Sequence, residues 1–448
     1  MDIKVLLVIL FIAGYLAITL EHTLRVDKLI PALGMMALLW AIIALNQMDV
    51  FNVNSDLKQL EPTQLEDILV HHLGKTAEIL IFLIGAMTIV EIIDYFDGFA
   101  TIKNFIRTKS KVKLLWIFSI LAFILSAIID NLTATIVLIT ILQKVIKDRN
   151  TRLWFAGLIV IAANAGGAWS PIGDVTTTML WIANKVTAWQ LVEHTFIPSV
   201  VCMVIPVLIA SRLKVFSGEI EIDLKEDTAP SKYGATMLYM GLGAIIFVPA
   251  FKTVTHLPPY IGMMLSLAVV ATFAEIFSHR LFDISSVGED KDASDAASHH
   301  SPVHKSLGRV EMPSILFFLG ILMAVAALES LGMLFNFAID LDHAIPNRDI
   351  VVGILGIGSA IIDNVPLVAA SIGMFSEPLD HPLWHFIAYS AGTGGSILII
   401  GSAAGVVAMG MEKINFFWYF KKIGLLAFLG FAAGGIAFML MRDLVLNV

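Results

Sequence analysis

The chain has 448 residues, of which 58% are hydrophobic and 15% are charged, and its mean hydropathy is +0.85. Soluble domains do not reach these values, so the composition predicts a polytopic, all-α membrane protein. The net charge of −8 gives no footprint for a nucleic-acid partner, and the single cysteine, Cys202, excludes an internal disulfide.

Apolar runs predict helices along the whole chain, separated by polar segments. The helices are expected at about residues 5–20, 29–45, 77–97, 153–188, 196–213, 235–251, 260–277, 313–337, 384–411 and 417–441. The segment 46–76 is polar and acidic, which indicates an external loop with at most a surface helix, and 215–232 and 280–311 are expected as linkers.

One six-residue motif occurs twice in the chain. The stretch Ser126-Ala-Ile-Ile-Asp130-Asn131 returns letter for letter as Ser359-Ala-Ile-Ile-Asp363-Asn364, 233 positions later. A Gly-Gly pair follows each copy, first at 166–167 and then at 394–395. Two elements repeated in the same order at nearly one offset indicate a duplicated unit.

The two copies of the motif have opposite flanking charges. Lysine and arginine dominate the segments on both sides of the first copy, whereas aspartate and glutamate dominate those around the second. The apolar arms beside each Asp-Asn pair are too short for two crossings, because a spanning helix needs about 20 residues. By the positive-inside rule, the sequence predicts re-entrant hairpins at 114–143 and 350–375 that enter from opposite sides, as in an inverted repeat.

Each Gly-Gly pair lies inside a run long enough to cross a membrane. Pro171 and Gly173 predict a break in the helix 153–188, and glycines alone predict one in 384–411. A broken helix exposes backbone groups at membrane depth, which is tolerated only where they line a cavity. The expected regions are N-terminal helices and a loop over 1–76, a first repeat half over 77–214, intervening segments over 215–312 and a second repeat half over 313–448.

Polar residues at these tips and breaks suit an alkali cation. A carboxylate at membrane depth needs a cation, a proton or a partner, so one group can hold Na⁺ and H⁺ in turn. We expect Na⁺ at three aspartates: Asp130, Asp174 and Asp363. Neutral oxygens would complete or support the shell, and they belong to Asn131, Asn364, Thr133, Thr176, Thr177, Asn164, Ser170, Ser359, Ser396 and Ser402. The alternative is that the Asp and Asn side chains only cap half-helices.

Further titratable residues lie near these segments. Glu91, Asp94 and Glu329 interrupt helix ends that correspond between the halves, and they are either relay carboxylates or acids at the membrane interface. Glu78 and the pair His71 and His72 are candidates for pH sensing, against the alternative of solvated loop residues.

These motifs resemble those of the NhaD-type sodium/proton antiporters of the ion transporter superfamily. The resemblance covers nearly the whole chain and rests on residues 126–135, 164–178, 359–366 and 392–401. It implies exchange of Na⁺ or Li⁺ for H⁺ by a homodimer in a bacterial inner membrane. It also implies an ion site that includes Asp130, Asn131, Asn164, Asp174, Thr176, Thr177, Ser359, Asp363 and Asn364. No cofactor is predicted besides the transported ions.

Other functions fit the residues less well. Dicarboxylate carriers of the superfamily have uncharged tips, and the fixed negative charge here opposes an organic anion. An arsenite-efflux carrier shares the Asp-Asn tips but calls for nearby thiols, of which only Cys202 is present. An enzyme is not predicted, because Asp174 lacks the Gly-x-Gly-Asp context of an intramembrane protease and no zinc-protease or Walker motif occurs. The sequence alone leaves a passive channel as a remaining alternative function.

Overall fold

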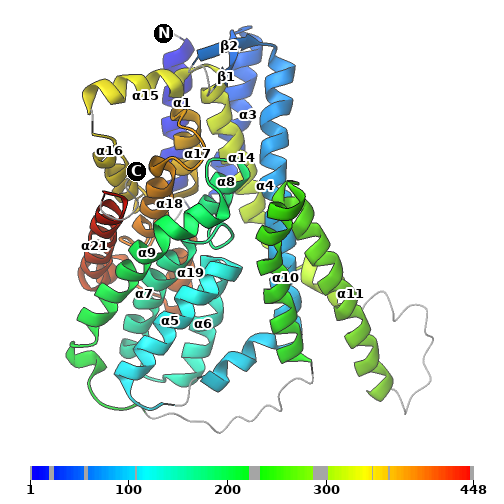
Figure 1. Ribbon diagram of the computed structural model, residues 1–448, viewed down its shortest axis with the longest axis vertical. Coiled ribbons are helices and arrows are strands. Elements are labelled where there is room, and N and C mark those ends of the chain that lie inside the picture. The colour runs from blue at the N-terminus through cyan, green and yellow to red at the C-terminus, as the bar shows by residue number, and fades with distance from the viewer. Residues whose placement is uncertain are drawn as a thin grey trace.

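The computed structural model describes residues 3–19, 25–54, 59–105, 108–220, 233–285, 301–345, 347–361 and 364–443. In this part of the chain the fold is almost entirely helical (Figure 1), which confirms the predicted all-α class. The strands in it form a short antiparallel hairpin, β1 (Val50–Asn54) with β2 (Gln59–Thr63).

The N-terminal region differs from its prediction. It consists of α1 (Ile3–Thr19), α3 (Leu29–Leu45), the β-hairpin and the long α4 (Leu65–Tyr95). The expected loop 46–76 is thus a β-hairpin followed by the first turns of α4. Glu66 and Asp67 lie in the first turn of α4, where acidic side chains stabilise the positive end of the helix dipole. The apolar period begins only later, so hydropathy alone placed the start of this helix too late.

The first repeat half contains a helical hairpin and a broken helix. After the short η1 (Gly98–Phe105), α5 (Lys111–Ile129) and α6 (Asn131–Val145) are joined by the single residue Asp130. The next helix is interrupted, as α7 (Arg149–Gly167) and α8 (Val175–Ile182) are separated by residues 168–174, which include Pro171. The break therefore lies where the proline predicted it.

The second repeat half has the same order of elements. Here α16 (Arg348–Gly358) and α17 (Asn364–Met374) form the hairpin arms, and α18 (Pro382–Gly394) and α19 (Ala403–Glu412) form the broken helix. The helix expected at 313–337 is divided into α14 (Met312–Ser330) and α15 (Met333–Ala344), because Gly332 has a φ of +67° that ends the first helix.

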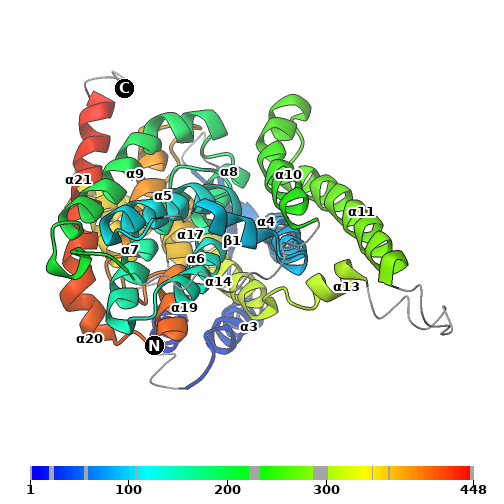
Figure 2. The ribbon, with the colours of Figure 1, turned by 90° about the horizontal axis from the view of Figure 1, so that it is seen from below.

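The remaining helices surround these units. They are α9 (Ala188–Ala210), η2 (Lys214–Phe216), α10 (Gly234–Thr255), α11 (Pro259–Ser285), α13 (Pro302–Leu307), and the continuous run of α20 (Phe416–Tyr419), η3 (Phe420–Gly424) and α21 (Leu425–Met441). Helix α9 packs along α21, and α10 and α11 pack on α4 at one side of the molecule, as Figure 2 shows.

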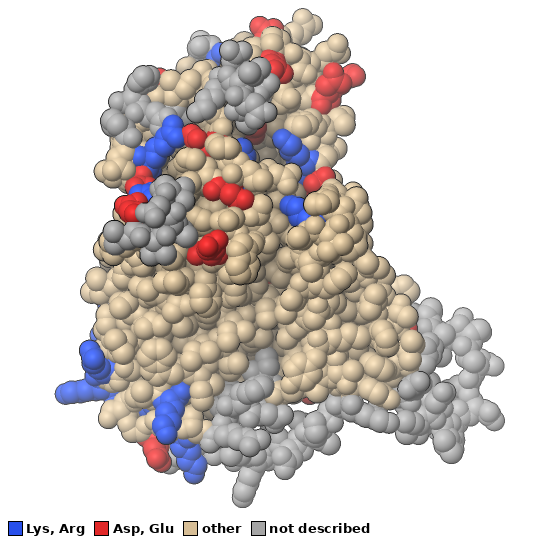
Figure 3. Space-filling model, viewed as in Figure 1, with Lys and Arg blue, Asp and Glu red and all other residues tan. Residues whose placement is uncertain are grey.

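Length and apolarity support a membrane location. Among the described residues, seven helices are long and apolar enough to cross a membrane: α4, α5, α9, α10, α11, α14 and the run α20–α21. On the face shown in Figure 3, a broad band almost without charged side chains separates mostly basic residues at the lower end from mixed charges in the upper half. The protein is therefore a multi-pass membrane protein.

Helices α4 and α14 run in opposite directions. Asp94 at the end of α4 lies 3.7 Å from Arg309, just before α14, whereas Gly332 after α14 lies against Leu60, just before α4. The hairpin α5–α6 occupies the lower part of Figure 1 and α16–α17 the upper part. Helix α6 packs on α19, and α17 packs on α8, so each hairpin contacts the broken helix of the other half.

Candidate ion-binding site

Four helices begin at one cavity of about 70 Å³ between the two halves. Its lining includes the first residues of α6, α8, α17 and α19, which are Asn131, Val175, Asn364 and Ala403. Helix N-termini present unpaired N–H groups and a partial positive charge. The tips and breaks expected from the sequence are therefore brought together, and their helix ends favour negative charge at the cavity.

Asp130 forms the turn between α5 and α6 and lines this cavity. Its carboxylate accepts hydrogen bonds from the Thr133 backbone N–H at 2.8 Å and from Thr133 Oγ1 at 2.9 Å. Its backbone angles, φ +85° and ψ +158°, lie in a region that is almost restricted to glycine. Strain of this kind persists where the surroundings hold it, and it is concentrated at functional sites. Asp130 thus caps α6 and also faces the cavity.

Asp174 is the second carboxylate in the cavity wall, and its side chain joins the two halves. It is 3% exposed, and its Oδ2 accepts hydrogen bonds from Asn364 Nδ2 at 2.9 Å and from Thr176 Oγ1 at 2.8 Å. Although Asp174 stands at the N-cap of α8, its side chain makes no capping bond. Its carboxylate is therefore held by side chains and is aimed at the cavity, so helix capping does not explain it.

A chain of hydrogen bonds connects the other tip asparagine to the second break. Asn131 Nδ2 donates to Asn164 Oδ1 at 3.3 Å, and Asn164 Nδ2 donates to Ser402 Oγ at 3.0 Å. Ser402 Oγ also accepts from the Gly405 N–H at 3.2 Å and so caps α19. This chain fixes the amide of Asn131 at the cavity through α7 and α19.

The motif serines hold each hairpin to its own broken helix. Ser126 Oγ donates to the Ala163 carbonyl at 2.5 Å, and Ser359 Oγ donates to the Ala391 carbonyl at 3.2 Å. The glycines match as well, because a Cβ on Gly166 would collide with the backbone of Phe123, as one on Gly394 would with that of Gly356. Ser359 is absent from the cavity lining, so its contacts here are those of a packing residue.

The other expected shell residues lie behind the cavity wall. Thr177 Oγ1 donates to the Asp174 carbonyl at 2.9 Å, Ser396 Oγ donates to the Thr393 carbonyl at 2.7 Å, and Ser170 Oγ accepts from the Ile172 N–H at 3.4 Å. These contacts stabilise the two breaks. Asp363 lies outside the described residues.

The candidate relay and sensor residues are distributed along α4 and α14. Glu91 and Asp94 line a second cavity of about 510 Å³, together with Asp97, Arg309, Glu311 and Thr133. Glu329 lies at the opposite end of α14, beside Gly373 of α17. The structure does not bring these residues to the first cavity.

The candidate histidines belong to a helix. His71 and His72 lie on α4, with ring centroids 5.5 Å apart, and so does the half-buried Glu78. None of the three lines the first cavity. The predicted loop is wrong for this pair, because α4 begins earlier than its hydropathy indicated, but His71 is exposed and only His72 is buried.

Several residues near the site escape sequence reasoning. Thr178 lines the cavity and donates to the Pro171 carbonyl at 2.9 Å; its place after Thr176 and Thr177 was a usable signal. Lys28 lines the same cavity, and its Nζ lies 4.5 Å from the Phe317 ring centroid. It precedes an apolar run, where a lysine normally marks only a helix end, so its sequence context gave no signal.

Comparisons with known proteins show which family the chain belongs to. The sequence profile of the family described as "Citrate transporter" matches residues 8–383. The chain is 41% identical to "Sodium/proton antiporter 1" of Arabidopsis thaliana over 98% of this chain and 73% of that protein. It is 31% identical to "Na(+)/H(+) antiporter NhaD" of Vibrio cholerae over 90% of this chain and 84% of that protein. It is 30% identical to the protein of the same name from Alkalimonas amylolytica over 95% of this chain and 88% of that protein. The chain therefore belongs to the NhaD-type sodium/proton antiporters.

Proposed function

We propose that the protein exchanges Na⁺ for H⁺ across a membrane and that Asp130 and Asp174 hold the two cations alternately. One observation carries this proposal. Two carboxylates and two tip asparagines, Asn131 and Asn364, line one cavity at which four helices begin. A carboxylate there binds H⁺ or Na⁺ but not both, and this competition couples the two fluxes.

The helix N-termini explain how one scaffold serves both anion and cation carriers. In a carrier for an organic anion, converging N-termini would stabilise the substrate's negative charge. Here Asp130 and Asp174 supply that negative charge from the chain itself. The cavity then attracts a cation, and a dicarboxylate would meet two carboxylates. Arsenite efflux gains no support either, since the described lining of this cavity contains no cysteine.

Asp363 belongs to the proposed site by its position in the repeat. It corresponds to Asp130 in the duplicated motif and directly precedes Asn364, whose amide donates to Asp174. The amide and hydroxyl groups around these carboxylates suit a small hard cation, so Li⁺ is proposed as a second substrate. Asn131, Thr176 and Thr177 complete the proposed shell or orient it.

We further propose that the two halves form an inverted repeat with re-entrant hairpins. Three observations support this: the opposite directions of α4 and α14, the matched contacts of Ser126 and Ser359, and the crossed packing of the two hairpins. Alternating access then consists of movement of this central unit against the surrounding helices. A homodimer and a location in a bacterial inner membrane are proposed from the family.

The acidic cavity on α4 is proposed as an access path at the basic end of the molecule. Glu91 and Asp94 line it, and so does Thr133, which donates to Asp130 in the first cavity. Glu329 is the corresponding acid at the other end. Because Phe82 and Leu83 on α4 line the ion cavity, pH sensing by Glu78, His71 or His72 would act along that helix.

Proton movement in inside-out vesicles tests the exchange. Vesicles containing the protein are acidified inside, NaCl is added outside, and the luminal pH is followed. We expect alkalinisation by Na⁺ in the wild type and its loss in Asp130→Asn and Asp174→Asn, with folded protein present at equal amounts. A passive channel would let Na⁺ in without a coupled release of H⁺ from the lumen. A wild type without any Na⁺ response would overturn the proposed function.

A further inference from the structure

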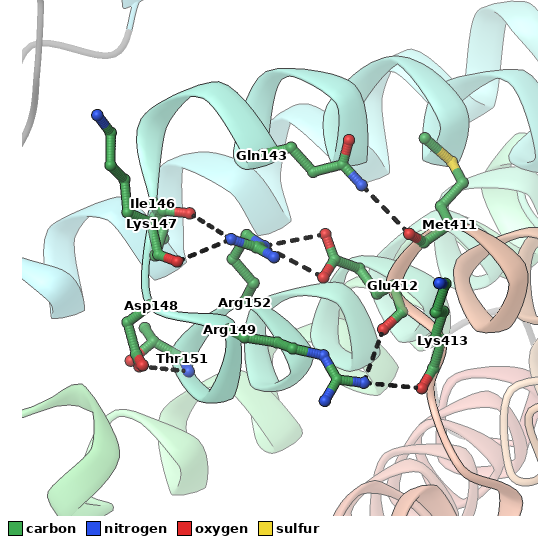
Figure 4. A network of polar contacts seen from close by, with 10 residues as sticks. All are labelled: Gln143, Ile146, Lys147, Asp148, Arg149, Thr151, Arg152, Met411, Glu412 and Lys413. Carbon is green, nitrogen blue, oxygen red and sulfur yellow. Dashed lines mark hydrogen bonds and ion pairs between the residues drawn. The ribbon is translucent and has the colours of Figure 1, made fainter.

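Arg152 and Glu412 join three helices at their ends distant from the ion cavity (Figure 4). Arg152, in the first turn of α7, has its Nε 3.1 Å from both carboxylate oxygens of Glu412, at the end of α19. Its Nη1 donates to the carbonyls of Ile146 and Lys147, just after α6, at 3.1 and 2.9 Å. One guanidinium therefore connects α6, α7 and α19. We call this contact the Arg152–Glu412 clamp.

Neighbouring side chains extend the clamp to the last carbonyls of α19. Arg149 Nη2 donates to the Glu412 and Lys413 carbonyls at 3.5 and 3.2 Å, and Gln143 Nε2 donates to the Met411 carbonyl at 3.3 Å. The last carbonyls of a helix have no intrahelical partner, so these donors stabilise the C-terminal end of α19. The end of α19 is held by groups from both α6 and α7.

The burial of the pair indicates a role beyond stability. The Glu412 side chain is 1% exposed and that of Arg152 is 19% exposed. Desolvation offsets much of the attraction in such a pair, so apolar residues would often stabilise the fold equally well. What a charge-assisted contact of Nε with both carboxylate oxygens adds is defined geometry. The clamp fixes the position of α19 against α7 along the helix and about its axis.

The same three helices are joined again at the ion cavity. There the contacts are those of Asn131 on α6, Asn164 on α7 and Ser402 before α19. The two junctions are about 15 Å apart along α19 and about 22 Å apart along α6, at 1.5 Å per residue. The helices pack on one another between the junctions. A shift of α19 at the clamp would therefore displace Ser402 at the cavity.

We propose that Arg152 and Glu412 are positioning residues for the ion site, which rests on the proposed exchange function. The clamp keeps Ser402 where it accepts the hydrogen bond from Asn164. Asn164 in turn keeps its Oδ1 toward Asn131, whose amide lines the cavity. Neither clamp residue touches the transported ion. Loss of the clamp alters the affinity of the site for Na⁺ while the carboxylates that bind the ion remain.

Transport kinetics of Glu412→Gln test the proposal, because glutamine keeps the shape and removes the charge. We expect the apparent KM for Na⁺ to rise about tenfold, the lower end of the loss caused by removing an outer partner of a metal site. The maximal rate per folded protein should stay within about twofold, since the ion-binding carboxylates are unchanged. Arg152→Lys keeps the charge but not the planar guanidinium that reaches Glu412 and the two carbonyls at once, and an intermediate KM is expected.

A matched control comes from the same turn of the chain. Asp148 caps α7 by accepting from the Thr151 N–H at 2.8 Å, and its side-chain hydrogen bonds stay within the first turn of α7. Asp148→Ala should lower stability and leave the KM for Na⁺ unchanged. If Glu412→Gln behaves in the same way, with less folded protein and an unchanged KM, the clamp is only structural and the proposal is overturned.

A double-mutant cycle tests whether the clamp acts through Ser402. Ser402→Ala already removes the bond to Asn164, so Glu412→Gln should raise the KM little further in that background. Multiplicative effects of the two changes would contradict the proposed route.

A second readout does not depend on transport. Glu412→Gln should speed hydrogen exchange at residues 403–405, where the Gly405 N–H bonds Ser402, and Asp148→Ala should not. If hydrogen exchange at these residues is unchanged in Glu412→Gln, the proposed positioning role of the clamp is overturned, even if the variant transports ions. If the wild type does not exchange Na⁺ for H⁺ but the variants still show these differences in hydrogen exchange, the proposed function is overturned and the role of the clamp is retained.

Discussion

The two helix breaks have nearly the same backbone and different chemistry. Asp174 before α8 has φ −149° and ψ +149°, and Ser402 before α19 has φ −145° and ψ +152°. Ser402 caps its helix, whereas Asp174 makes no cap and instead accepts from Asn364 and Thr176. The two breaks thus share a backbone geometry, while one has a charged side chain, Asp174, and the other has a neutral anchor, Ser402.

A second pair of equivalent positions differs in the same sense. Asn164 on α7 bridges Asn131 and Ser402, but its counterpart on α18 is Gly392. A Cβ on Gly392 would lie 3.6 Å from Asp174 Oδ2 and 3.0 Å from the Ala168 Cβ. The missing side chain leaves room beside the carboxylate. The second break has the neutral Ser402, whereas the first has a buried charge, Asp174, with space beside it.

Removal of that charge gives the largest expected effect. In Asp174→Asn the side-chain oxygen can still accept from Asn364, but it cannot neutralise a cation. We expect Na⁺-driven proton movement in vesicles to fall by more than about 100-fold, beyond the typical loss for an outer partner. Activity within tenfold of the wild type would place the exchanged cations elsewhere.

The shared scaffold predicts equal damage at equivalent glycines. Gly166→Ala and Gly394→Ala each direct a Cβ into the backbone of the facing hairpin arm, at Phe123 and Gly356. We expect each to destabilise the protein by about 1–3 kcal/mol, as overpacking does, seen as a lower melting temperature in detergent. Gly410→Ala on α19 is the control, because a Cβ there meets nothing within 4 Å. A large loss of stability in only one of the two variants would contradict the prediction that the two halves share the same packing.

Loss of the neutral anchor should weaken ion binding without abolishing exchange. Ser402→Ala removes the acceptor for Asn164 and should raise the KM for Na⁺ about tenfold, as loss of an outer partner does. Ser110→Ala is the control for the lost cap alone, because Ser110 accepts from the Lys113 N–H at the start of α5, outside the cavity lining. Equal KM values for Na⁺ in the two variants would show that Ser402 acts only as a helix cap.

The smallest expected effect is at the cap of α7. Hydrogen bonds from the Thr151 side chain and backbone lower the pKa of Asp148, so the folded state favours its ionised form. Its contribution is present above the ordinary aspartate pKa and is lost as pH falls through the lowered folded value. Asp148→Ala should cost about 1 kcal/mol at neutral pH. The melting difference from the wild type should shrink below about pH 4. A difference independent of pH would contradict an ionic cap.

The sequence was most informative where polar residues interrupt apolar runs. Asp130 and Asn131 lie in the middle of such a run, and their repetition predicts two hairpins and, together with the glycines, two breaks. Pro171 marked the first break because proline removes a backbone donor. These signals are local, and four of the residues that they single out, Asp130, Asn131, Asp174 and Asn364, line one cavity in the structure.

The remaining features depend on contacts between distant residues. Arg152 and Glu412 are 260 positions apart, and each alone is an ordinary charge at a helix end. The sequence did not predict the early start of α4, because the first turns of this helix are polar. It did not predict the split at Gly332, because the apolar pattern continues through this residue. Tertiary packing also determines which of the expected shell residues line the cavity and which stabilise the backbone behind it.

Proton release on Na⁺ binding tests the central claim most directly. Purified protein in a weakly buffered detergent solution is mixed with NaCl, and the pH is followed with a dye, with choline chloride as the control for ionic strength. If Na⁺ and H⁺ compete for Asp130 and Asp174, Na⁺ releases protons from the wild type and from Ser402→Ala at higher concentrations, but not from Asp174→Asn. Saturable Na⁺ binding without proton release would contradict the account.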